Sequence, residues 1–289
     1  MNTLLEILSP DFLLQNALYG GLIIGFVAPL VGLYLVGRRM VFLGVALPQV
    51  ATAGVAGAFF WHALFHQGQL HEGDFWLALA GSTVFTLAAI LGLALLESSG
   101  RSRTEGRTGV LYAFAGALSL LLVASDRIAE VGILGLMKGE IITIPTGELL
   151  VLAVGYAVIV LALWVFKKEL LLVSVDRDLA LSLGKKVLAW DVVLYLIIGT
   201  TISLGVLLVG PLVMFGFLIV PPLIASRLTT GIRHLPLAAS LVGGLAAFVG
   251  FAVSYRLDWP TGPTDVALVC AMLALVAGMQ TAIGWLRRA

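Results

Sequence analysis

The chain has 289 residues, of which 60% are hydrophobic and 11% are charged, and its mean hydropathy is +1.08. Soluble proteins average about 45–50% apolar and about 25% charged residues, so this composition excludes an ordinary soluble protein. The net charge of +1 excludes a nucleic-acid-binding surface, since such a surface needs a concentrated basic face. We expect an all-α, polytopic helical membrane protein with a single transmembrane domain over residues 1–289.

Apolar stretches near the length of about 20 residues that crosses a bilayer as a helix follow one another along the chain. They make nine predicted spans, or eight with a hairpin, at residues 12–36, 42–61, 75–96, 109–125, 147–166, 189–208, 212–226, 236–254 and 265–286. The nearly uncharged region from Leu188 to Ala225 is interrupted by Gly205, Gly210-Pro211, Gly216 and Pro221-Pro222. Glycine and proline at membrane depth predict short, broken helices near 204–222 that pack against neighbours or line a path.

The distribution of Lys and Arg predicts the orientation of these spans. Of the 17 basic residues, 14 lie on one side, near residues 38–39, 101–107, 167–186, 227–233 and 287–288. The other side holds only Arg127, Lys138 and Arg256. The positive-inside rule places the first set and the C-terminus in the cytoplasm and the N-terminus outside. The outer loops are then 62–74, 126–146 and 255–264, and the middle one is expected to form a short interfacial helix.

Three of the four histidines lie in the first outer loop, HALFHQGQLHEGD. His62 and His66 are four residues apart and would share one face of a continuing helix, and His71 lies beside Glu72. Two interpretations are open: an entrance site that captures a divalent metal ion, or solvated loop residues. His234, on the inner side, is expected to be a loop residue.

The segment 167–187 is too charged to cross a membrane, yet it contains a helix-period stretch from Asp178 to Gly184. We expect a short helix across the cytoplasmic mouth of the protein. The chain contains no GxxxxGK[ST] phosphate loop, so it cannot hydrolyse a nucleotide by that route. If ATP drives transport, another subunit must bind it.

The order of motifs resembles the permease subunits of the zinc/manganese/iron class of bacterial ABC importers. The resemblance is carried by RRMVFLGVALPQVATAGVA at 38–56, RTGVLYAFAGALSLLLVAS at 107–125, LMKGEIITI at 136–144, KELLLVSVDRDLALSLG at 168–184, LGVLLVGPLVMFGFLIVPPLIASRL at 204–228 and DWPTGPT at 258–264. It implies a homodimeric, non-enzymatic permease in the bacterial plasma (inner) membrane, with a cytoplasmic ABC ATPase and an extracytoplasmic solute-binding protein as partners. It also implies alternating access for a divalent metal ion such as Zn, Mn or Fe as cargo, with no permanently bound cofactor. The short helix would then couple to the ATPase through Asp178, Leu179, Ala180, Leu181, Leu183 and Gly184.

The second predicted span departs from the family pattern. Where the family has Asp and, four residues later, His, this chain has Val45 and Gln49, and Pro48 replaces the usual Ser. Asp and His one helical turn apart can present an oxygen and an imidazole nitrogen to a divalent cation, whereas Val45 offers no ligand and Gln49 offers a neutral carbonyl oxygen. Pro48 is expected to kink the helix and free a carbonyl near Gly44. A chelated metal or a small organic solute is therefore the alternative cargo.

Gln49 and Thr52 are the polar side chains in the interior of the second span, three residues apart on one face. We expect them, with Val45 and Pro48, to line the translocation path, and the alternative is a pair of interhelical hydrogen bonds.

None of the 16 Asp and Glu residues lies clearly in the middle of a span. This disfavours an intramembrane enzyme and a proton-coupled secondary carrier, because both depend on ionisable groups there. Asp191 is expected at a hydrated boundary, and Cys270 is expected to pack inside the last span.

Overall fold

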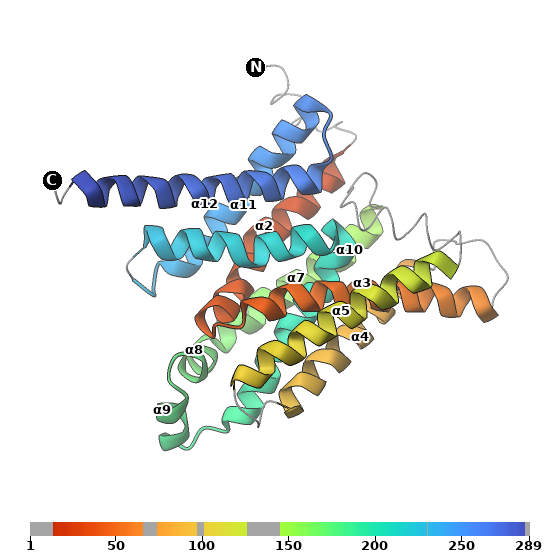
Figure 1. Ribbon diagram of the computed structural model, residues 1–289, viewed down its shortest axis with the longest axis horizontal. Helices are drawn as coiled ribbons and strands as arrows, with labels where there is room; N and C mark the ends of the chain where they lie inside the picture. The colour runs from red at the N-terminus through yellow and green to blue at the C-terminus, as the bar shows by residue number, and fades with distance from the viewer. Residues whose placement is uncertain (1–13, 66–73, 97–100, 126–144, 230, 287–289) are drawn as a thin grey trace.

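The computed structural model describes residues 14–65, 74–96, 101–125, 145–229 and 231–286, and these residues form helices joined by short turns, with no strand among them (Figure 1). Within these described ranges, eight helices are long and apolar enough to cross a membrane. They are α2 (Gln15–Gly37), α3 (Val41–Phe65), α4 (Asp74–Leu96), α5 (Arg101–Ser125), α7 (Thr146–Val165), α10 (Val187–Leu228), α11 (Leu235–Leu257) and α12 (Thr261–Leu286). Two short helices, α8 (Lys167–Val175) and α9 (Arg177–Ser182), lie between α7 and α10 along the chain. The prediction of an all-α, polytopic membrane protein is confirmed.

Each predicted span overlaps a long helix, and two of them fall in α10. α5 differs most, because it begins at Arg101 instead of at residue 109. Charged residues such as Arg and Glu are good helix formers, so the helix continues past the apolar segment. The interfacial helix predicted within 126–146 lies almost wholly outside the described residues.

α10 bends sharply at Gly210, its one residue with non-helical backbone angles (φ 77°, ψ 171°). These angles are open to glycine and strained for other residues. A Cβ atom built on Gly205 would collide with the sulfur of Met214, although residues nine apart are separated by about 13.5 Å along a straight helix. The two arms of α10 therefore meet at a sharp bend and run from it in different directions, as Figure 1 shows.

The break in α10 confirms one of the predicted interruptions and corrects the others. The predicted gap between spans 189–208 and 212–226 coincides with Gly210. Gly216, Pro221 and Pro222 instead lie within the helical second arm, where all three are buried. Pro222 packs at the close contact of this arm with α2, since a Cβ atom on Gly32 would lie 3.1 Å from its ring.

Close backbone contacts hold the centre of the bundle together. α2 and α11 meet where Gly25 faces Gly243, and a Cβ atom on Gly25 would lie 2.8 Å from the Gly243 carbonyl oxygen. α3 and α4 meet in the same way where Gly54 faces Gly81. Small residues let helices approach closely in a membrane, where dispersion contacts replace hydrophobic burial as the main source of association.

Several polar side chains inside the bundle form hydrogen bonds between helices. The Thr83 hydroxyl of α4 and the Ser203 hydroxyl of α10 lie 2.8 Å apart. The Tyr156 hydroxyl of α7 donates to the carbonyl oxygen of Thr201 at 2.9 Å. These bonds satisfy groups that would be costly to leave unpaired in an apolar interior, and they tie α4 and α7 to α10.

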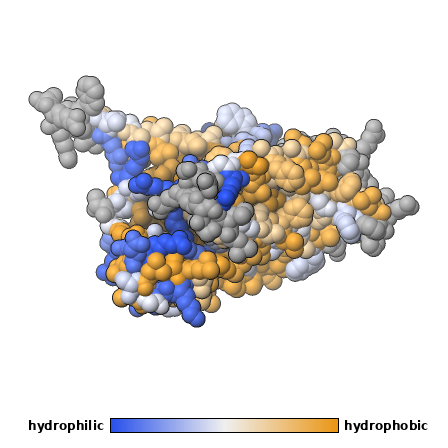
Figure 2. All heavy atoms as spheres, turned by 60° about the horizontal axis from the view of Figure 1, so that its bottom comes forward, coloured by the Kyte–Doolittle hydropathy of each residue, from blue (hydrophilic) through white to orange (hydrophobic). Residues whose placement is uncertain are grey.

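The face in Figure 2 is largely apolar, with hydrophilic residues gathered at the end where α8 and α9 lie. The helix ends near the basic segments contact one another: Arg38 after α2 bonds Asp191 of α10, and Gln280 of α12 bonds the Arg227 carbonyl oxygen at 2.6 Å. Cys270 is exposed on α12, so the expectation that it packs inside the protein is wrong. Hydropathy alone does not distinguish the packed face of a span from its outer face.

Candidate translocation path and coupling segment

Gln49 of α3 is half-buried and faces α5. Its amide nitrogen donates to the Ser119 hydroxyl at 3.4 Å, and that hydroxyl donates to the Gly116 carbonyl oxygen at 2.9 Å. A Cβ atom on Gly116 would lie 3.6 Å from the Gln49 amide nitrogen, so this glycine leaves space for the side chain. Of the pair of interhelical hydrogen bonds named as the alternative, the one from Gln49 is therefore present, and the carbonyl oxygen of Gln49 is not used in it.

The other residues predicted for the path differ in accessibility. Val45 is half-buried, one turn before Gln49, whereas Thr52 and Pro48 are buried. Thr52 donates to the carbonyl oxygen of Pro48 at 3.0 Å, within its own helix. α3 continues as one helix through Pro48, so any bend there is too small to end it. Of the four residues predicted for the path, Val45 and Gln49 are thus the two whose side chains are not fully buried.

α9 is a short helix with well-defined ends. The Asp176 carboxylate caps it by accepting from the Leu179 backbone N–H at 2.9 Å. After α9, the Gly184 N–H donates to the Leu181 carbonyl oxygen and the Lys185 N–H donates to the Ala180 carbonyl oxygen. Gly184 itself adopts a left-handed φ of 71°. This arrangement ends helices and favours glycine. The predicted helix at 178–184 is therefore present at Arg177–Ser182, and its cap is Asp176, which the sequence argument missed.

One side of α9 is buried and the other is open. Ala180 is fully buried in a small apolar cluster with Val173 of α8 and Val187 of α10. Three leucines remain exposed at 46%, 56% and 61%, namely Leu179, Leu181 and Leu183. Three exposed leucines beside charged residues form an apolar patch of the kind that contacts another protein or a membrane surface. Asp178, in the first turn, is also exposed.

An ion-pair cluster joins the short helices to the long ones. Asp191 of α10 accepts from Arg38 at 2.7 Å through one carboxylate oxygen and pairs with Arg177 of α9 at 3.1 Å through the other. Arg38 also donates to the Ser174 hydroxyl of α8 at 2.9 Å. The Asp191 side chain is 4% exposed, so the expectation that it is hydrated is wrong. Its position near the helix start was correct, but the packing of α2, α8 and α9 around it excludes water.

A sequence profile of the ABC 3 transport family matches residues 11–281. The chain belongs to the ABC 3 transport family. Members of this family are permease subunits, so the chain is a transport component and ATP hydrolysis occurs in a partner subunit. The family also implies a substrate-binding protein as a partner.

Relatives and a solved structure match nearly the whole permease. The zinc transport system membrane protein TroC of Treponema pallidum is 29% identical, with 100% of this chain and 97% of that protein covered. The manganese import system permease protein ScaB of Streptococcus gordonii is 24% identical, with 91% and 90% covered. The solved structure of PsaBC from Streptococcus pneumoniae in complex with Fab is 22% identical, has a TM-score of 0.78, and covers 92% of this chain and 91% of that one. The fold is thus the one in that structure.

The predicted histidine site is only partly within the described residues. His62 lies in the last turn of α3 and is half-buried, while His66 and His71 lie outside the described residues. Among the residues that the structure describes, no group of three or more His, Cys, Asp or Glu side chains is placed to hold a metal ion. Metal capture at this entrance stays a prediction. His234 is exposed beside the start of α11, as expected for a loop residue.

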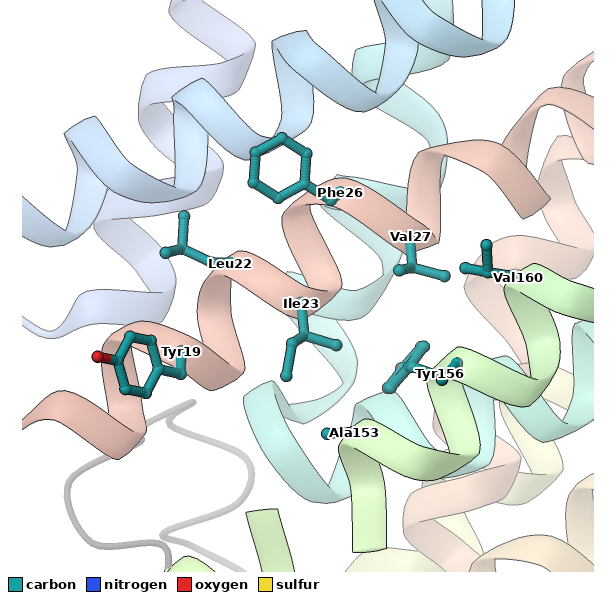
Figure 3. Close-up of a pocket in the computed structure, with 9 residues that line it drawn as sticks. Tyr19, Leu22, Ile23, Phe26, Val27, Ala153, Tyr156 and Val160 are labelled. Atoms are coloured by element: carbon teal, nitrogen blue, oxygen red, sulfur yellow. The ribbon is translucent and has the colours of Figure 1, made fainter. Parts of the chain in front are cut away.

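A groove between α2 and α7 has no features of an ion path. The groove is lined by residues of α2 and α7, and Figure 3 shows Ile23 and Val27 of α2 pointing toward Ala153, Tyr156 and Val160 of α7, whereas Leu22 and Phe26 point to the other side of α2. Its volume is about 600 Å³, and the Tyr156 hydroxyl is used in the bond to Thr201. Aliphatic and aromatic side chains cannot replace the water around a cation, so this groove does not fit a metal ion.

Asp265 is a buried acid that sequence position did not single out. It lies in the second turn of α12, is 4% exposed, and packs against Gly250 of α11. One of its carboxylate oxygens has no hydrogen-bond partner among the described residues. The packing of α12 on α11 buries it, and its place near the start of an apolar span does not reveal that contact.

Proposed function

We propose that this permease imports a divalent metal ion, Zn, Mn or Fe, past Gln49 of α3 by alternating access. The observation that carries the proposal is the family match over residues 11–281, together with relatives named as zinc and manganese transport proteins. The half-buried Gln49 supports a path at the face shared by α3 and α5. With one neutral oxygen and a non-ligating Val45, this face would hold the ion weakly, so selectivity would lie with the solute-binding protein.

A homodimer would complete this path. One chain leaves Gln49 partly exposed, and the apolar outer face of α5 includes Val110, Phe114 and Leu121, at 71%, 64% and 70% exposure. A second copy against this region would close the other side of the path and cover part of that face. The permease itself needs no permanently bound cofactor, and the metal ion is its cargo.

Import of a chelated metal is the second candidate. It is favoured by Val45 and Gln49, because a chelator already supplies the ligands that these side chains lack. A polar chelate would need hydrogen-bonding partners, and the half-buried Gln49 offers its amide carbonyl oxygen, which the bond to Ser119 does not use.

Metal uptake tests the proposed cargo. Cells that express the permease with its ATPase and solute-binding protein are expected to accumulate at least one of Zn, Mn and Fe severalfold above a matched control. The control carries an ATPase whose phosphate-loop Lys is replaced by Ala, which removes the residue that contacts the nucleotide phosphates. Elemental analysis measures the metal. Equal accumulation in both strains for all three metals would contradict import of the free ion and leave the chelate as cargo to be measured.

We also propose that the basic end faces the cytoplasm of a bacterium and that the protein lies in the plasma membrane. The support is the 14-to-3 distribution of Lys and Arg, since cytoplasmic loops are enriched in these residues. In a Cys270→Ala background, Ala63→Cys should react with a membrane-impermeant maleimide in intact spheroplasts. Leu181→Cys should react only after permeabilisation. Both sites are exposed, so the reverse pattern would overturn the orientation and not report burial.

A further inference from the structure

We propose that Asp191 is a positioning residue for energy coupling, which holds α9 in a fixed place relative to α2 and α10. This inference rests on the proposed role of α9 as the contact with the ATPase. Through Asp191, a displacement of α9 would be passed to two helices of the membrane domain.

The geometry of the carboxylate makes it a bridge. Arg38 takes one oxygen of Asp191 at 2.7 Å and Arg177 takes the other at 3.1 Å, so neither arginine occupies both. Arg38 follows α2, Arg177 begins α9, and Asp191 lies in the second turn of α10. The end of α2, which is distant in the sequence, and the consecutive helices α9 and α10 therefore converge on one group.

α9 needs such an anchor because it is short. A six-residue helix is not stable alone in water, so its position depends on what it touches. Ala180 supplies an apolar contact with α8 and α10. The ion pair of Arg177 with Asp191 supplies a directional link, and through Arg38 it extends to the end of α2.

The two halves of the bridge differ in burial. The Arg38 and Asp191 side chains are 9% and 4% exposed, whereas the Arg177 side chain is 55% exposed. The inner pair, Arg38 with Asp191, is shielded from water and salt, so it holds a fixed position. The outer pair, between Asp191 and Arg177, can be removed by replacing Arg177. The buried Asp191 carboxylate then remains paired with Arg38, so no buried charge is left unpaired.

The chain offers a matched control at the same end. Lys185 and Glu169 form an ion pair at 3.6 Å between the turn after α9 and α8, with side chains 42% and 27% exposed. Exposed pairs of this kind contribute little to stability. Glu169→Gln removes a charge from the same segment but leaves the link from α9 to α2 and α10 intact.

The first measurement is the number of cargo ions moved per ATP hydrolysed, in proteoliposomes that contain the permease, its ATPase and its solute-binding protein. Asp191→Asn keeps the shape of the side chain but has only one acceptor oxygen, so one of the two arginines loses its partner. Asp191→Asn and Arg177→Met are expected to lower the ratio at least tenfold, Arg177→Lys to restore part of it, and Glu169→Gln to leave it unchanged. A purely structural role would lower transport and ATP hydrolysis together, leaving the ratio constant, and would overturn the proposal.

The second measurement needs no ATPase and reports the position of α9 directly. Spin labels at Gly37→Cys and Leu181→Cys, in a Cys270→Ala background, lie at the end of α2 and on the exposed side of α9. A Cβ atom on Gly37 meets no other atom within 4 Å, so that label is accommodated. Arg177→Met should broaden the distance distribution between the labels, and Glu169→Gln should not.

The two readouts separate this inference from the proposed docking role of α9. An unchanged distance distribution in Arg177→Met overturns the anchoring. A broadened distribution with an unchanged transport ratio overturns the coupling role of Asp191. If the label distances respond as expected but charged substitutions of the α9 leucines leave coupling intact, the docking role of α9 is what fails. Because Arg177 is exposed, its variants test the proposal even if Asp191→Asn does not fold.

Discussion

Replacing Leu179 and Leu183 by Asp is expected to abolish stimulation of the ATPase by the permease. Both side chains are about half exposed in the free chain. Docking would bury the exposed half of each and so contribute roughly half of the about 1.5–3 kcal/mol that burial of a whole leucine side chain contributes. For two residues this is about 1.5–3 kcal/mol, and two unpaired carboxylates in the interface add several more. Since about 1.4 kcal/mol is tenfold in affinity, the complex should weaken by about 100-fold or more.

The measurement is the affinity of the purified permease for its ATPase, with ATP hydrolysis followed in parallel. Met at both positions is the matched control, because it keeps an apolar side chain of similar volume. Asp at position 179 lies in the first turn of α9, where a negative charge is favourable, so α9 itself should persist. Unchanged thermal unfolding of the double variant checks this. Normal ATPase binding by a folded double variant would show that α9 is not the docking helix.

Combining Val45→Asp with Gln49→His is expected to tighten metal binding in the membrane domain by at least about tenfold. A carboxylate and an imidazole one turn apart replace an alkyl group and a neutral amide on the accessible face of α3. Two unit charges 4 Å apart interact by about 4 kcal/mol near a protein surface, so a carboxylate near a divalent ion exceeds the about 1.4 kcal/mol that tenfold requires. Tighter binding should slow release and reduce turnover.

Equilibrium binding of Zn and Mn to the detergent-solubilised permease measures this effect, with turnover in proteoliposomes as the second readout. Val45→Asn with Gln49 retained is the control, because it matches the size of Asp without its charge. Equal metal affinity in the double variant, the control and the unmodified protein would place the ion path away from this face of α3.

Gln49 shows how much of the candidate path could be predicted from the sequence. Its polarity within an apolar span marked it as a residue facing another helix or a path, and the structure places it against α5. Its partner Ser119 was missed, although a serine three residues after Gly116 in an apolar span was a visible signal. The pairing of Gln49 with Ser119 depends on which faces of α3 and α5 meet, and periodicity within one helix does not report that.

α10 shows the same contrast between a local sequence signal and the tertiary packing that decides its effect. Gly210-Pro211 predicted an interruption because both residues disfavour a continuous helix, and the break is there. Pro221 and Pro222 carry the same local signal, yet the helix continues through them. Packing against α2 at Gly32 stabilises that arm, so tertiary contacts outweigh a local helix-breaking tendency there.

The sequence by itself determined which segments are apolar enough to span a membrane and that a short helix begins near Asp178, and it assigned 14 of the 17 basic residues to one side. These properties follow from the length of a bilayer-spanning helix and from local composition, so they need no knowledge of neighbouring segments. Only the tertiary structure decided that Asp191 is bridged between two arginines, that Asp265 is buried, and that Cys270 is exposed. The environment of a charged or small side chain is created by helices distant in the sequence, and the free energy of burying it depends on the groups that those helices bring to it.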